Sequence, residues 1–167
     1  MTDFTYEFRK TTVGFLRGYI GDQDRLMYPT DDELDIFLRN RIRWGVFNEQ
    51  LTCFKGHFYS LNPGPVLDLT ITTGVAGTRY RIDEPTKHVQ WVSGSGAQPA
   101  DNSLIEISYI DIYFFGVVRD VLLAIATDRA KLAVKAKAEG MSSDLTLLRG
   151  EIMQQIAAIG AVEYWGP

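Results

Sequence analysis

The chain has 167 residues, of which 46% are hydrophobic and 12% aromatic, enough to bury the core of one domain. Its formal net charge of -4 argues against a protein that binds nucleic acid through a strongly positive surface. The single cysteine excludes an intramolecular disulfide and is typical of a protein made in a reducing compartment.

The sequence contains no pattern typical of export or of a membrane span. No basic stretch followed by an apolar run opens the chain, so we expect no signal peptide. The longest apolar stretch, 110–115, contains Asp111 and is far shorter than the roughly 20 residues that a spanning helix needs. We therefore expect a soluble protein that has no membrane partner.

The strongest local pattern lies near the amino terminus. After a segment over 3–20 whose aromatic residues recur at near-helical spacing, Thr30-Asp31-Asp32-Glu33 forms a capping box. In such a box the threonine side chain accepts from the Glu33 amide, and the glutamate accepts from the threonine amide. The pattern predicts a helix over 31–43, with its acids at the positive end of the helix dipole and its arginines at the negative end.

The middle of the chain alternates apolar and polar residues, as half-buried strands do. The alternation predicts a meander of short strands over 66–72, 78–82 and 88–92, followed by one more strand over 104–109. Glycine and serine dominate the segment between the last two strands, which predicts a flexible linker over 93–103.

The remainder of the chain has the pattern of helices. An alanine-rich stretch without proline predicts a long helix over 111–138, and leucine and isoleucine residues from 145 to 159 predict a final amphipathic helix. The expected fold is α+β but predominantly α-helical: a helical bundle with a long central helix and a small antiparallel β insertion. We expect one domain over 1–160, with the β-rich insertion at about 62–110 and a carboxy-terminal arm at 161–167.

Residues that carry enzyme chemistry are few and scattered. Cys53 and His57 lie four apart, but the aromatic residues beside them favour packing over a thiolate–imidazole pair. One cysteine and two histidines are too few for a typical zinc site, and His88 fits an ordinary sheet position. The sequence therefore predicts no catalytic site, no metal and no cofactor.

Two groups of residues are candidates for contacts with partners. Large aromatic residues at a chain end are typical interface anchors, so Tyr164 and Trp165, together with Pro167, are candidate docking residues. Basic residues are candidates for contacts between subunits or with DNA, although solvated helix ends would explain them as well. These are Arg39, Arg41, Arg43, Lys131 and Lys135.

The order of these elements resembles that of the head-to-tail connector adaptor family of tailed bacteriophages. A capping-box helix, a strand-rich insertion, a long alanine-rich helix and a final helix follow one another along the chain. The likeness is carried by residues 28–38 (YPTDDELDIFL), 120–133 (DVLLAIATDRAKLA) and 143–149 (SDLTLLR). The likeness lies in the amino-acid pattern of these segments and in the order of the elements, and it includes no catalytic signature.

The resemblance implies a structural virion protein at the head–tail junction, assembled in the host cytoplasm. Such a protein forms a ring of about twelve copies beneath the portal through head-to-tail contacts between subunits. A stopper or tail-completion protein binds the other side, and double-stranded DNA passes through the centre without sequence-specific binding. By this resemblance the carboxy-terminal segment, with Tyr164 and Trp165, is the arm that docks on the portal.

Other functions stay open at this point. A neighbouring neck or tail-completion protein of the same virion would fit the same residues, and only the binding partner distinguishes it. From another class, a small-ligand-binding or enzymatic α+β domain would require a cluster of titratable side chains around one pocket. A DNA-binding regulator would require salt-sensitive affinity for duplex DNA, against which the acidic balance argues.

Overall fold

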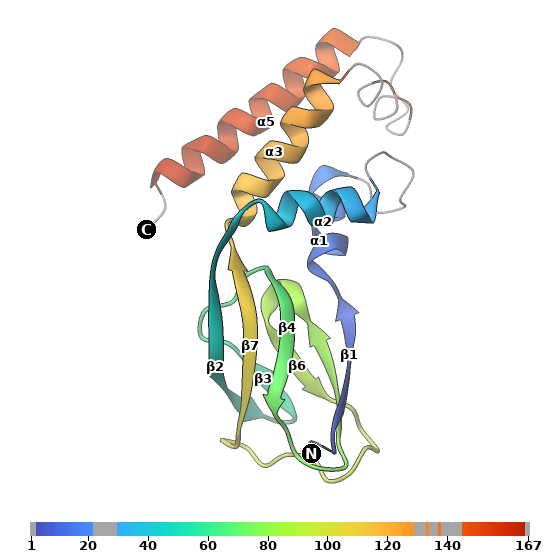
Figure 1. Ribbon diagram of the computed structural model, residues 1–167, viewed down its shortest axis with the longest axis vertical. Coiled ribbons are helices and arrows are strands. Elements are labelled where there is room, and N and C mark those ends of the chain that lie inside the picture. Colours follow the sequence, from blue (N-terminus) through green and yellow to red (C-terminus); the bar gives the residue numbers. More distant parts are fainter. Residues whose placement is uncertain (1–2, 22–29, 129–132, 134–136, 138–144, 166–167) are drawn as a thin grey trace. The chain divides into compact units, whose positions relative to one another are not determined.

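The computed structural model describes residues 3–21, 30–128, 133, 137 and 145–165, and the chain divides into two compact units (Figure 1). The sheet unit comprises residues 1–15 and 42–112, and the helical unit comprises residues 16–41 and 113–167. The chain therefore passes from one unit to the other three times. Each unit combines segments that lie far apart in the sequence.

The sheet unit consists of one mixed sheet that almost closes into a barrel. Its order is β1-β5-β6-β3-β2-β7-β4; β1 and β5 run parallel, and every other neighbouring pair is antiparallel. The strands are β1 (Thr5–Lys10), β2 (Ile42–Phe54), β3 (His57–Tyr59), β4 (Val66–Thr73), β5 (Arg79–Asp83), β6 (His88–Trp91) and β7 (Leu104–Ile112), with the short 3-10 helix η1 (Glu84–Thr86) between β5 and β6.

The inner face of the sheet buries the alternate apolar residues of each strand, as the two-residue repeat of a strand requires. Bulges in β2 and in β4 interrupt the pairing of both strands with β7, which lies between them. Asn48 and Asp68 adopt positive φ angles of 57° and 52° at these bulges. Because bulges bend a strand and increase its twist, they help the sheet to curl. The residues packed together inside include Leu51, Phe58, Leu69, Tyr80, Ile82, Val89, Ile105 and Ile107.

Side chains rather than hydrogen-bonded strands close the seam between β1 and β4. At one end the hydroxyl of Thr12 donates to the carbonyl of Val66. Glu84 accepts hydrogen bonds from the amides of Thr12 (2.9 Å) and Leu69 (3.5 Å), and burial raises the pKa of this carboxyl. At the other end the ring of Phe4 packs against Gly74, where a Cβ atom would come within 2.8 Å of it.

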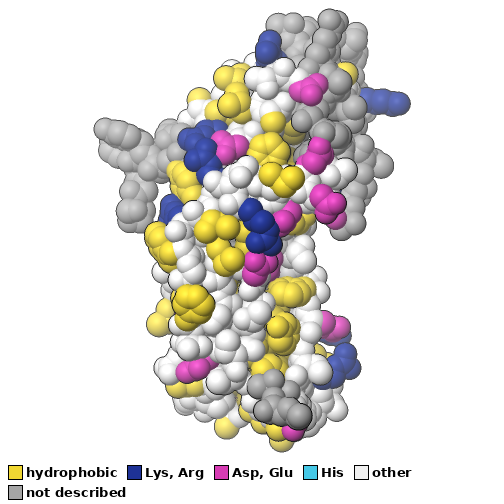
Figure 2. Space-filling view, viewed as in Figure 1, with side chains coloured by type: hydrophobic (Ala, Val, Ile, Leu, Met, Phe, Trp, Pro, Cys, Tyr) yellow, Lys and Arg dark blue, Asp and Glu magenta, His cyan; other side chains and the backbone are white. Residues whose placement is uncertain are grey.

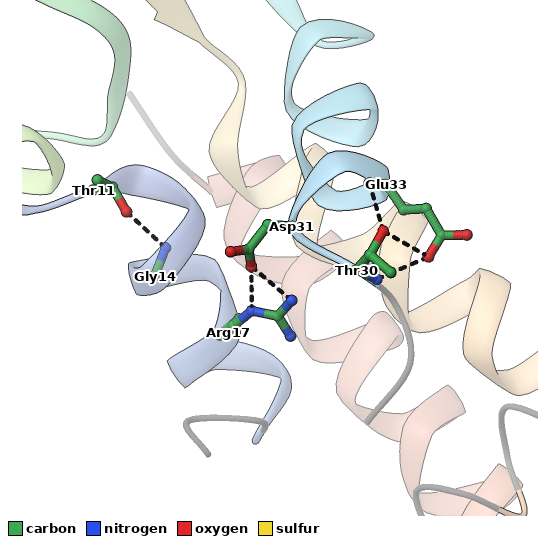
Figure 3. A network of polar contacts seen from close by, with 6 residues as sticks. All are labelled: Thr11, Gly14, Arg17, Thr30, Asp31 and Glu33. Atoms are coloured by element: carbon green, nitrogen blue, oxygen red, sulfur yellow. Dashed lines mark hydrogen bonds and ion pairs between the residues drawn. The ribbon is translucent and has the colours of Figure 1, made fainter. Parts of the chain in front are cut away.

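The helical unit contains α1 (Thr12–Ile20), of which only residues 16–20 belong to this unit, together with α2 (Asp31–Arg39), α3 (Phe114–Thr127) and α5 (Leu145–Trp165). The predicted capping box is present at the start of α2: Thr30 accepts from the Glu33 amide, and Glu33 accepts from the Thr30 amide (Figure 3). Nearby, the buried Arg17 guanidinium binds Asp31 at 2.7 Å and ties α1 to α2. None of the described helices is both long and apolar enough to cross a membrane.

The expected helical bundle with a small β insertion is wrong. Helix and strand account for nearly equal shares of the structure, 37% and 36%, and strands occur from residue 5 to residue 112 rather than only within 62–110. The amino-terminal aromatic residues Phe4, Tyr6 and Phe8 alternate with period two, which suits β1 better than a helix. The long strand β2 was not predicted at all.

Several predicted boundaries also differ. The helix predicted over 31–43 ends at Arg39, because β2 begins at Ile42. The helix predicted over 111–138 is described as α3 from Phe114 to Thr127. Its predicted start falls within β7, and its predicted end at residue 138 lies outside the described residues. Of the predicted meander only β5 and β6 are neighbours; β4 pairs with β7 instead.

The predicted flexible linker over 93–103 is a well-bonded loop. Its Ser95 side chain accepts from the Arg79 amide, and the Trp91 indole donates to the Ser95 carbonyl at 2.9 Å. Further along, Asn102 donates to the Cys53 carbonyl and Cys53 donates to the Ser103 carbonyl. A composition rich in glycine and serine therefore reflects tight turns in this loop, not freedom of the chain.

Candidate functional site

The amino-terminal half of β2 has an open edge. Between Ile42 and Asn48 the strand pairs with β7 on one side, whereas β3 pairs only with residues 52–54 on the other side. No other described strand lies beside residues 42–48. This segment, called here the β2 edge, therefore presents backbone groups that a further strand can pair with.

Large apolar side chains cover the β2 edge. Phe47 is 82% exposed, Trp44 is 57% exposed and Ile42 is 44% exposed. The bulge at Asn48 interrupts the alternation just after Phe47, and Arg43 lies over the Trp44 ring with its guanidinium carbon 5.7 Å from the ring centroid. Exposed aromatic residues beside an open strand edge are typical of a surface that binds another protein.

A second group of exposed aromatic residues lies on β1, the first strand of the sheet order, whose unpaired side faces β4 across the seam. β1 pairs with β5 alone, and all six of its residues are exposed. Tyr6 and Phe8, which lie opposite the buried Tyr80 and Ile82 of β5, are 38% and 42% exposed. Their rings contact each other at 6.4 Å. Residues 5–10, called here the β1 edge, therefore carry partly exposed aromatic rings beside the seam.

These two edges lie on opposite flanks of the sheet unit (Figure 1). Three strands separate β1 from β2 in one direction around the sheet, and β7, β4 and the unpaired seam separate them in the other. Figure 2 shows that hydrophobic side chains reach the visible surface of this unit in several places, with charged side chains between them.

The two histidines form a group of titratable side chains on the outer face of the sheet. His57 on β3 and His88 on β6 approach to 3.0 Å between ring nitrogens, and Tyr59 stacks on His88 at 4.8 Å. Burial, and then the charge of His57, lower the pKa of His88; Asp83, 3.7 Å away, opposes both effects. The described residues include no group of three or more side chains suited to hold a metal ion.

A buried lysine forms another polar cluster. The Lys87 amine donates to the Tyr109 hydroxyl at 3.1 Å and lies over the Tyr109 ring. Burial lowers the pKa of Lys87, while Glu49 and Asp111 oppose that effect; burial likewise raises the pKa of Tyr109 to about 12. Because Lys87 is 4% exposed, a substrate would not reach its amine, and the cluster is best explained as a polar contact within the fold.

Cys53 and His57 lie on opposite faces of the sheet. Cys53 is buried, as its aromatic neighbours predicted, and its Sγ atom lies 3.7 Å from the Pro99 carbonyl. In the β2–β3 hairpin Cys53 lies opposite Phe58, and His57 lies opposite Phe54, so the two side chains point in opposite directions. The arrangement cannot produce a thiolate–imidazole pair.

The predicted contact residues do not form one group. Arg39 pairs with Asp35 on the surface of α2, and Arg41 makes two hydrogen bonds to Asp120, at 2.6 and 2.9 Å. Arg43 belongs to the β2 edge. Lys131, Lys135 and Pro167 lie outside the described residues. Tyr164 and Trp165 were expected beyond the last helix, but α5 continues through Trp165.

The aromatic residues of the β2 edge were missed because no strand was predicted there. A usable signal was present: Ile42, Trp44 and Val46 alternate with polar residues or glycine, and β-branched and aromatic residues favour strands. Comparisons with protein-family models, with curated proteins and with solved structures each found no match.

Proposed function

We propose that this chain is a structural protein of a tailed-phage virion, a head-to-tail adaptor that forms a ring between the portal and the stopper or tail proteins. The observation that carries the proposal is the exposure of Trp44 and Phe47 beside the open backbone of the β2 edge. Exposed apolar surface costs about 25 cal/mol per Å², so burying these rings against another protein favours assembly. The resemblance of three sequence segments to the adaptor family supplies the identity of the assembly.

The charges of the chain suit a ring through which DNA slides. A net charge of -4 gives little general attraction for phosphate groups. Arg39 and Arg41, two candidates for contact with DNA, are engaged by Asp35 and Asp120 within their own chain. The channel contacts proposed for Arg43, Lys131 and Lys135 would then be few, so that DNA moves with little friction.

Docking on the portal is proposed for the carboxy-terminal aromatic residues. Tyr164 and Trp165 end the helix α5, so the docking element is the end of a helix and the residues beyond it. Removing residues 161–167 shortens α5 at its end and leaves Leu148 and Ile152, its described buried residues, in place. We expect this truncated chain to keep its helical content by circular dichroism and to lose binding to the portal.

The proposal is tested by the mass of the protein in solution. Light scattering or native mass spectrometry of the protein, alone at rising concentration and with the purified portal of the phage that carries it, should show a ring that forms most readily on the portal. Phe47→Lys should prevent the ring, because it places a charge at the centre of the contact. Leu61→Lys is the matched control, since Leu61 is fully exposed in the loop after β3.

A different result would assign another role. A protein that stays monomeric with the portal at every concentration would contradict the proposal. Binding to a purified stopper or tail-completion protein but not to the portal would favour a neighbouring neck component instead. If Leu61→Lys impaired assembly as much as Phe47→Lys, the β2 edge would lose its special role.

A further inference from the structure

We propose that His57 and His88 together bind one divalent transition-metal ion of the kind that prefers imidazole ligands, with Zn²⁺ as the example. The two side chains come from β3 and β6, which are neighbouring antiparallel strands of the sheet unit. The proposal concerns this unit alone, so it does not depend on the ring, on the portal or on the proposed function.

The sheet places both imidazoles on its outer face. In the β3–β6 ladder the buried Phe58 lies opposite the buried Val89. Because successive side chains of a strand point to opposite faces, the residues just before this pair, His57 and His88, point outward. The backbone of the two strands therefore holds the rings beside each other before any ion binds.

The distance between the two rings suits two ligands of one ion. Nδ1 of His57 and Nε2 of His88 lie 3.0 Å apart, and the ring planes differ by only 9°. With Zn–N bonds of about 2.0–2.1 Å, two nitrogens on one ion lie roughly 3.0 Å apart at a right angle and roughly 3.3 Å apart at a tetrahedral angle. In the metal-free protein the two nitrogens share one proton. An ion takes the place of that proton when each ring turns its lone pair toward the ion.

Asp83 supplies the carboxylate that a metal-binding imidazole usually has behind it. Its Oδ2 atom lies 3.7 Å from Nδ1 of His88, the ring nitrogen that does not face His57. A carboxylate in this place keeps the hydrogen on Nδ1 and directs Nε2 toward the metal. The other oxygen of Asp83, Oδ1, is buried and has no hydrogen-bond partner in the part of the chain that the structure describes. A positive ion on His88 would compensate this carboxylate.

The surroundings favour the neutral imidazole that a metal ion requires. Burial lowers the pKa of His88, and the charge of His57 lowers it further. The positive charge of Arg9 also acts on this ring, but it is the weakest of these influences. The His88 side chain is 19% exposed, so an ion and its water ligands can reach it from the solvent.

The ligands determine which ions the site would take. Imidazole nitrogens suit Zn²⁺, Cu²⁺ and Ni²⁺, whereas Mg²⁺ and Ca²⁺ prefer oxygen ligands. Two protein ligands are fewer than the four of a structural zinc site, so water fills the remaining positions. We therefore expect an ion that exchanges with the solvent, and a fold that forms without it.

Calorimetric titration of the metal-free protein, prepared without a histidine tag, tests the site. We expect one Zn²⁺ to bind per chain and no binding of Mg²⁺. His57→Gln and His88→Gln should each abolish Zn²⁺ binding, and Asp83→Asn should weaken it by about tenfold. Glu151→Gln is the matched control, since it removes an exposed carboxylate on α5 and should leave binding unchanged. The native Cys53 is 1% exposed and should not compete.

Nuclear magnetic resonance of the wild type gives an answer even if a variant fails to fold. Added Zn²⁺ should shift the ring-nitrogen signals of His57 and His88 together. Zn²⁺ binding that persists in either histidine variant would overturn the proposal. An absence of binding to the wild type, or a shift in one ring only, would overturn it as well.

Discussion

At the scale of single residues, the helical unit depends on a few charged pairs of different burial. Arg41 and Asp120 are 34% and 25% exposed and share two hydrogen bonds, whereas Arg39 and Asp35 are about 40% exposed and form an ordinary surface pair along α2. A paired guanidinium and carboxylate gain more when water is partly excluded and both hydrogen bonds form. The Arg41–Asp120 pair joins residue 41, where the chain leaves α2, to α3.

We therefore expect Asp120→Asn to lower the free energy of unfolding by about 1 kcal/mol. Asp35→Asn should lower it by only about a few tenths of a kcal/mol. Urea unfolding of both variants, followed by circular dichroism, measures the difference. Equal effects from the two substitutions would show that the bidentate geometry of Arg41 adds nothing to stability.

The histidine pair should make the sheet unit sensitive to acid. His88 has a lowered pKa in the folded chain, chiefly through burial and then through the charge of His57. Below its ordinary pKa of 6.5 the unfolded chain therefore binds more protons than the folded chain, so the free energy of unfolding falls as the pH drops. Asp83 and Arg9 also act on this ring, with opposite signs.

We expect the stability advantage of the wild type over His88→Gln to shrink as the pH is lowered through 6.5, the ordinary pKa of the imidazole. Urea unfolding at several pH values on each side of that pKa gives this difference, in which the groups that titrate independently of His88 cancel. A difference that is constant across the range would mean that His88 titrates alike in the folded and unfolded chains.

At the scale of elements, the seam of the sheet depends on close approach at Gly74. A Cβ atom there would lie 2.8 Å from the Phe4 ring, which also makes an edge contact with the buried Tyr80. The ring would have to move, and with it the start of β1. Overpacking of this kind typically costs about 1–3 kcal/mol.

Gly74→Ala should therefore lower the melting temperature by several degrees, in line with that cost. Gly64→Ala is the matched control, because a Cβ atom at residue 64 would meet no atom within 4 Å and its φ angle is not positive. Differential scanning calorimetry measures the melting temperatures of both variants and of the wild type. Equal melting temperatures would show that Phe4 moves aside at no cost.

The sequence predicted those elements that are specified by a pattern within a few neighbouring residues, such as a capping box or a short alternation of apolar and polar residues. The capping box fixed the start of α2 because both of its hydrogen bonds join residues 30 and 33. Strands β4 to β7 were found because their apolar residues alternate over one half-buried face. The end of α2 was missed, because the arginines after residue 38 suit either a helix end or a strand.

At the scale of the whole molecule, sequence patterns could not predict how the elements combine. Strand β2 pairs with β7, some 60 residues further along the chain, and β1 pairs with β5 at a separation of more than 70 residues. Short-range spacing carries no information on such contacts, so the fold class was misassigned as a helical bundle. The exposed aromatic residues of the β2 edge were missed for the same reason, since their exposure depends on the neighbouring strand β3 being too short to cover residues 42–48.

The most direct test of the account is hydrogen–deuterium exchange of the protein, free and bound to its portal. Burial of the β2 edge in the assembly would protect the amides of residues 42–48, because the groups that face away from β7 would no longer be open to water. The amides of the loop at 60–64 serve as an internal reference and should exchange alike in both states. Assembly on the portal with unchanged exchange in residues 42–48 would contradict the account.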